Sequence, residues 1–141
     1  MGAQEFESLR ENISRNIIEI KSIIKNSGSG DVLDRKAFDR SIYLFQSIVR
    51  LMINVGNNII IEHNFRSPMN TADVFISLAE QNVVPLAAVR GMKRAALAMP
   101  KIKNITDAEL IEIMAGCMDD FSQCLVSYAE FFEKQDRGED T

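Results

Sequence analysis

Apolar residues recur every three or four positions along most of the chain, which is the spacing of one buried face on an α-helix. The first such segment, from about Ala3 to Lys25, carries its apolar stripe at Phe6, Leu9, Ile13, Ile17, Ile20 and Ile24. A longer segment, from about Leu33 to Glu62, repeats the pattern at Phe38, Ile42, Phe45, Val49, Met52, Ile53, Gly56 and Ile60. Between them, Asn26 to Gly30 is rich in Gly and Ser and predicts a connector too short to separate domains. We therefore expect two long amphipathic helices.

Start and stop signals divide the rest of the chain into three more helices. After a loop over Asn64 to Pro68, Asn70 to Asp73 caps a short helix that ends near Leu78. Pro85 suits the first turn of a fourth helix to about Met99, which Pro100 should stop. The capping box Thr106 to Glu109 opens a fifth helix to about Lys134. Its expected inner face is Ile113, Cys117, Phe121, Cys124, Tyr128 and Phe131.

These elements predict one all-α domain over residues 1–141, an antiparallel bundle of about five helices with frayed ends at 1–2 and 135–141. Two acidic residues, Asp31 and Asp34, are alternatives for the N-cap of the second helix. Gly56 interrupts that helix, where it costs ~1 kcal/mol against Ala, so we expect a backbone or a ligand to approach closely there.

Composition narrows the class of protein. The chain is 46% hydrophobic and 26% charged, with a net charge of −4, which is typical of a globular domain. A non-specific nucleic-acid coat would be basic, so the totals argue against one. Cys117 and Cys124 stand seven residues apart on one helix, about 10 Å along its axis, too far for a disulfide. With free thiols, no signal-peptide pattern and no uninterrupted apolar run of about 20 residues, we expect a soluble cytoplasmic protein without a membrane partner.

The sequence offers no conventional catalytic constellation. His63 is the single histidine, neither cysteine has a second ligand at metal spacing, and no phosphate-cradling glycine loop is present. We expect no metal, no cofactor and no catalytic residue. His63 is expected to be a solvated or helix-capping residue, with a role in a site as the alternative.

Two polar features stand out. Asn54, Asn57 and Asn58 share one face of the second helix, either as a structural network or as the wall of a cleft. From Arg90 to Lys103 there are five basic residues and no acid, namely Arg90, Lys93, Arg94, Lys101 and Lys103. Such a run is usually a solvated helix face, and the functional alternative is a surface for phosphates or an acidic partner. If the two features border one groove, these eight residues form a candidate site for an anion or a partner.

The order of the sequence blocks resembles that of HepT-like HEPN proteins. The blocks are Val55-Gly56-Asn57-Asn58-Ile59-Ile60, a Pro-containing loop, Val74 to Glu80, and Val83-Val84-Pro85. The resemblance covers nearly the whole chain and rests on several blocks together. It implies a HEPN-like helical bundle, a homodimer paired through the fourth helix, and a relation to toxin–antitoxin ribonucleases.

The family's ribonuclease motif, Arg-Asn-x-x-x-His-x-Tyr, is degenerate here. Anchored on Ile105 to Asp107, the motif falls on Ala95 to Ile102, so Ala95, Ala96, Pro100 and Ile102 stand in place of its arginine, asparagine, histidine and tyrosine. On the second helix, Asn54 and Asn58 replace the family's acid and histidine. Alanine and proline can neither exchange a proton nor stabilise phosphate charge.

Three hypotheses follow. The first is a non-catalytic binding or scaffold module, a toxin–antitoxin relative, with a minimal nucleotidyltransferase or an RNA as candidate partners. The second is a HEPN-type ribonuclease toxin that uses displaced groups such as Arg94, Lys101 or His63. The third is a small-molecule pocket at the asparagine face.

Overall fold

The chain folds into helices alone over the residues that the computed structural model describes, 1–27 and 34–138. In order they are α1 (Ala3–Ser27), α2 (Arg35–Glu62), α3 (Asp73–Glu80), α4 (Leu86–Ala98), the 3₁₀ helix η1 (Met99–Asn104) and α5 (Asp107–Asp136). Most of the predicted connector, from Gly28 to Gly30, lies outside the described residues, as does the alternative cap Asp31.

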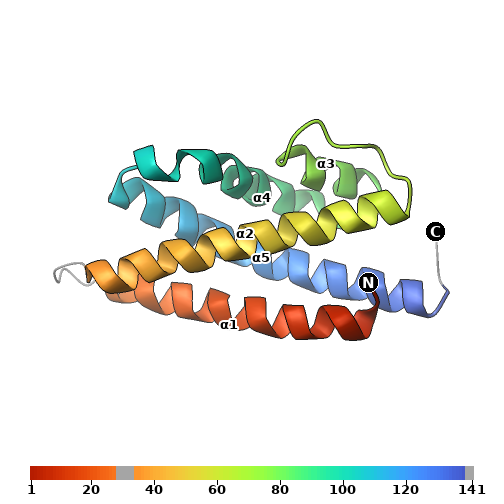
Figure 1. Cartoon of the computed structure of the whole chain (residues 1–141), viewed down its shortest axis with the longest axis horizontal. Helices are drawn as coiled ribbons and strands as arrows, with labels where there is room; N and C mark the ends of the chain where they lie inside the picture. The colour runs from red at the N-terminus through yellow and green to blue at the C-terminus, as the bar shows by residue number, and fades with distance from the viewer. Residues whose placement is uncertain (28–33, 139–141) are drawn as a thin grey trace.

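The four long helices lie side by side and run alternately in opposite directions (Figure 1). Helix α1 packs on both α2 and α5, and α5 packs on α4 as well. The short α3 lies across one end and packs on both α2 and α4. The predicted antiparallel bundle is therefore confirmed. Helices α2 and α4 are not among the most closely packed pairs, and α3 packs on both of them.

Aromatic side chains from three helices fill the centre of the bundle. Phe6 of α1 lies 5.1 Å from Phe132 and 6.0 Å from Tyr128 between ring centroids. Tyr128 is fully buried and its hydroxyl donates to the Met52 carbonyl at 3.0 Å, which satisfies the polar end of the ring. The predicted inner face of α5 is wrong at one residue. Phe131 is half-buried, and Phe132 lies in the core instead.

Side chains cap the two long helices where the sequence predicts. The Asp34 carboxylate accepts from the backbone N–H groups of Lys36 and Ala37, and the Thr106 hydroxyl accepts from Glu109 N–H at 3.2 Å. Pro100 does not stop the fourth helix outright. The α-helix ends at Ala98, and the chain continues through Pro100 as η1, because a proline at the start of a helical segment lacks only an N–H that would have no partner there.

Gly56 is a point of close approach, but the approaching groups are side chains of α3 and α5 and not the backbone or ligand expected from the sequence. A Cβ at this position would lie 2.8 Å from Val74 Cγ1, 2.9 Å from Leu78 Cδ1 and 2.9 Å from the Tyr128 hydroxyl. The missing side chain thus lets α3 and α5 meet α2.

Helix α2 is long and apolar enough to cross a membrane by length and composition, with a window of mean hydropathy 1.3. The helix contains no uninterrupted apolar run of this length, because Arg50 and several amide and serine side chains lie among its apolar residues. Half of that window is buried against the other helices, which is the behaviour of a core helix and makes composition weak evidence for a span.

Candidate functional site

The predicted basic segment forms an exposed face on α4. Arg90, Lys93 and Arg94 line a shallow depression of about 490 Å³. Its other lining residues are apolar, Leu86, Val89 and Leu97, of which Leu86 is 80% and Leu97 54% exposed. Lys101 and Lys103 follow as exposed residues of η1. The face combines exposed leucines with cations, a composition that suits a protein surface or a phosphate.

The asparagines lie elsewhere. Asn54 and Asn58 are exposed on α2 and Asn57 is half-buried. None of the three side chains makes a hydrogen bond to the described part of the chain, and none lines the depression on α4. Among the described residues, no hydrogen bond joins these amides to the basic residues of α4 and η1.

Acidic and thiol groups of α5 lie behind the basic face. Arg94 approaches Glu112 at 3.6 Å. Asp120 packs where a side chain on Gly91 would be, since a Cβ on Gly91 would lie 1.8 Å from its Oδ2. Burial raises the pKa of Cys117 to about 11 and that of Cys124 to about 12, so both thiols are protonated and unreactive near neutral pH.

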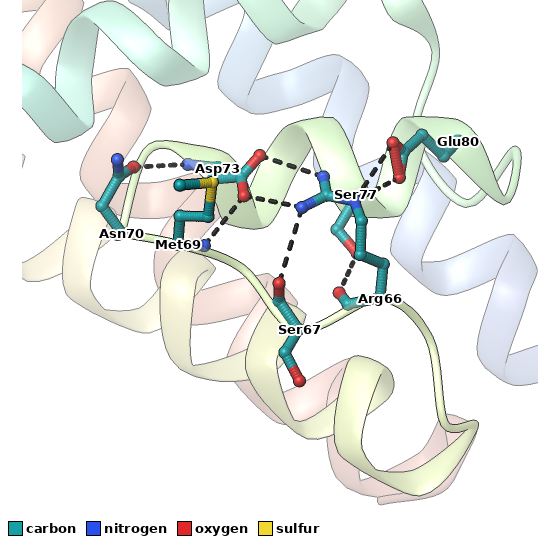
Figure 2. A network of polar contacts seen from close by, with 7 residues as sticks. All are labelled: Arg66, Ser67, Met69, Asn70, Asp73, Ser77 and Glu80. Atoms are coloured by element: carbon teal, nitrogen blue, oxygen red, sulfur yellow. Dashed lines mark hydrogen bonds and ion pairs between the residues drawn. The ribbon is translucent and has the colours of Figure 1, made fainter.

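A polar cluster around Arg66 fastens the loop before α3 to that helix, as Figure 2 shows. The guanidinium lies alongside α3 and bonds Asp73 at its first turn at 2.8 Å and Glu80 at its last at 2.7 Å. Asp73 also accepts from Met69 N–H at 2.8 Å, while Ser77 donates to the Arg66 carbonyl at 2.6 Å. Bonding to Arg66, and secondly to Met69 N–H, lowers the pKa of Asp73 to about 2.

His63 is the C-cap of α2, as one of the expected roles requires, but its ring is half-buried. The ring is stacked on Phe65 at 5.5 Å and meets Phe131 edge-on at 5.0 Å. Its Nε2 lies 3.0 Å from Gln135 Oε1, while Gln135 Nε2 donates to the Met1 carbonyl at 3.1 Å. Because a carbonyl can only accept, the amide orientation is fixed and Nε2 carries the histidine proton.

A cavity of about 670 Å³ opens beside His63. Its walls come from the ends of α2 and α3, the α3–α4 connection and the last turns of α5. The residues lining it are His63, Phe65, Ile76, Ala79, Glu80, Gln81, Asn82, Val83, Val84, Pro85, Leu86, Ser127, Glu130, Phe131, Lys134 and Gln135.

Two asparagines shape this cavity. Asn64 and Asn82 follow α2 and α3 with φ of 54° and 59°, the left-handed conformation that ends a helix. In each case the next residue closes the turn onto a carbonyl five positions back, Phe65 to Ile60 and Val83 to Leu78, both at 3.0 Å. Neither this cavity nor the Arg66 cluster was predicted from the sequence. The sequence pattern that indicates these two helix ends is an asparagine followed by an apolar residue.

The positions assigned to the family's ribonuclease motif carry no ionisable group. Ala95 and Ala96 are buried in α4, Pro100 is exposed in η1 and Ile102 is half-buried. His63 lines the cavity described above, whereas Arg94 and Lys101 do not, and Arg94 lines the depression on α4 instead. The displaced groups of the ribonuclease hypothesis therefore do not share one pocket among the described residues.

The arrangement of the helices is similar to that of a solved structure. A solved structure described as the toxin–antitoxin MntA–HpeT, in a tyrosine-to-alanine mutant, matches with a TM-score of 0.62 and 21% identity, covering 82% of this chain and 95% of that chain. At this identity the match establishes the fold. No family model matches the chain, and no curated protein matches its sequence.

Proposed function

We propose that this protein is a toxin–antitoxin relative of the HepT type that acts by binding, without cleaving RNA. The observation that carries the proposal is a fold shared with a toxin–antitoxin chain, combined with Ala95, Ala96, Pro100 and Ile102 at the motif positions. General acid–base catalysis needs a group that can hold and release a proton, and none of these side chains can.

The exposed face of α4 is the surface that we assign to partner binding. Leu86 and Leu97 stand at its two ends with Arg90, Lys93 and Arg94 between them. Exposed leucines flanked by charges are typical of interaction surfaces. The neighbouring helix α5 supplies exposed acids, Glu109, Glu112 and Asp119.

A second copy of the chain fits this face. In a two-fold dimer the basic face of one α4 can lie against the exposed acids of the partner's α5, and both copies make the same contact. We therefore infer a homodimer with the α4 helices near the two-fold axis. Ile102 stands at the tyrosine position of the family motif and has no hydroxyl. A nucleotidyltransferase partner would therefore bind without modifying a side chain at this position.

Light scattering tests the dimer. Leu97→Glu places a charge on the proposed interface and should convert the dimer to a monomer at micromolar concentration. Ile18→Glu, on the equally exposed surface of α1, is the matched control and should leave the dimer intact. A wild-type monomer at these concentrations would reject the interface.

An RNA-cleavage assay tests the absence of catalysis. The purified protein, with or without Mg²⁺, should leave a labelled RNA intact. Cleavage that disappears in His63→Ala or Arg94→Ala would establish the ribonuclease alternative instead.

Anion binding at the basic face is a separate expectation for Arg90, Lys93, Arg94, Lys101 and Lys103. Addition of a nucleotide or a short RNA should shift the backbone amides of α4 and η1 in NMR spectra. Shifts of Asn54, Asn57 and Asn58 in the same titration would extend the site to α2. Shifts confined to other helices would remove the basic face from consideration.

A further inference from the structure

The cavity beside His63 has the size and lining of a small-molecule site. At about 670 Å³ it falls within the ~300–1,000 Å³ typical of ligand pockets. Its apolar lining includes Phe65, Ile76, Val84 and Phe131, and its polar groups lie among exposed residues such as Glu130 and Lys134. This is the usual division in ligand pockets between an apolar body and a few polar groups that fix orientation.

Aromatic rings give the cavity a preference for flat ligands. Phe131 meets His63 edge-on at 5.0 Å and Phe65 stacks on the imidazole at 5.5 Å, so both phenyl rings are held against His63 at the wall. Rings fixed in this way offer a stacking surface at little entropic cost. The same π faces attract a cation.

Two carboxylates lie among the polar groups of the cavity. Glu130 makes no ion pair with any described residue and is a free carboxylate on α5. The Glu80 carboxylate is bonded to Arg66 yet keeps acceptor capacity. The donors are the ammonium of Lys134 and the amide and hydroxyl groups of Gln81, Asn82 and Ser127. Glu130 is therefore the anionic group of the cavity that has no cationic partner among the described residues.

We propose that this cavity binds an arylalkylamine, that is, a flat aromatic ring bearing a cationic amine, with the ring against Phe65 and Phe131 and the amine near Glu130. The proposal depends on neither the dimer nor the absence of ribonuclease activity, because the cavity is formed by the end of the bundle where α2 and α3 terminate.

Tryptamine is a suitable probe because the chain contains no Trp, so its indole fluorescence is observed without interference. On titration with the protein, tryptamine should show a blue-shifted emission and raised anisotropy. Indole-3-acetate has the same ring with the opposite charge and should bind about fivefold more weakly, the ratio expected for one charge pair at a partly exposed rim.

Two variants separate the charge from the ring. Glu130→Gln should bring the affinities for tryptamine and indole-3-acetate to within about twofold, and Glu133→Gln, an exposed change on the same helix outside the cavity, should keep the original ratio. Phe131→Ala should weaken both ligands, with circular dichroism as a check that the variant remains helical.

The result that supports the site is saturable binding of tryptamine with amide shifts confined to the residues lining the cavity. No binding at millimolar tryptamine, shifts elsewhere on the protein, or equal or tighter binding of indole-3-acetate would each overturn the proposal. An unchanged charge preference in Glu130→Gln would overturn the assigned position of the amine.

Discussion

Replacing Gly56 by alanine tests how the helices meet at the centre of the bundle. The new Cβ would lie 2.8 Å from Val74 Cγ1 and 2.9 Å from both Leu78 Cδ1 and the Tyr128 hydroxyl. Real Cβ atoms essentially never approach heavy atoms this closely, so these side chains or the helices that carry them must shift. Tyr128 is also the donor to the Met52 carbonyl, and displacing it weakens a buried hydrogen bond.

Two effects oppose each other in this variant. Alanine is favoured over glycine inside a helix by about 1 kcal/mol. Overpacking a dense core costs about 1–3 kcal/mol, and a buried polar group that loses its partner costs about 1–3 kcal/mol more. Since both costs apply at Gly56 and the helix preference offsets about 1 kcal/mol of them, we expect Gly56→Ala to lower the free energy of unfolding by about 1–5 kcal/mol.

Gly116→Ala is the matched control, because Gly116 also lies inside a helix and is exposed. Its Cβ would meet Arg94 Nη1 alone, at 3.3 Å, and that flexible side chain can move away. Here the helix preference should dominate and raise stability by about 0.5–1 kcal/mol. Urea unfolding followed by circular dichroism at 222 nm measures both variants. If Gly56→Ala is as stable as Gly116→Ala, the close packing of α2, α3 and α5 described above is wrong.

Three further predictions concern single groups. Burial raises the pKa of Tyr128 well above its usual 10, so the folded state resists its ionisation and the stability of the protein should fall as pH rises above about 10. In a spectrophotometric titration at 295 nm, this tyrosine should ionise only when the protein unfolds. Reversible ionisation in the folded protein would contradict its burial. Arg66 is the main cause that lowers the pKa of Asp73 to about 2, so the Asp73 carboxylate stabilises the fold above pH ~4 and this stabilisation is lost towards pH 2. In thermal melts over a series of pH values, Asp73→Asn should reduce the loss of stability between pH ~4 and pH ~2. An unchanged loss would show that the cluster does not contribute to stability. Thr106→Ala removes the cap of α5 and should lower the free energy of unfolding by about 1 kcal/mol, whereas Thr106→Ser should retain most of it.

The sequence by itself determined the helices of this protein. Their ends follow from local chemistry, such as the Asp34 and Thr106 caps, and their buried faces follow from the spacing of apolar residues. An antiparallel bundle then results from short connections between successive helices. Even the close approach at Gly56 could be predicted, because glycine inside a helix is unfavourable without a packing reason.

Tertiary structure alone decided which surfaces meet. The asparagine face of α2 and the basic face of α4 each have a clear sequence pattern, yet helical periodicity does not specify which helix packs on which, and here the depression on α4 is lined by α4 residues without the asparagines. Likewise, Phe131 and Phe132 are equivalent by sequence, and only the rotation of α5 in the bundle places one in the core and the other beside His63. The cavity arises where α2 and α3 end and meet α5, so its lining comes from segments far apart in the chain, and no local pattern could assemble it.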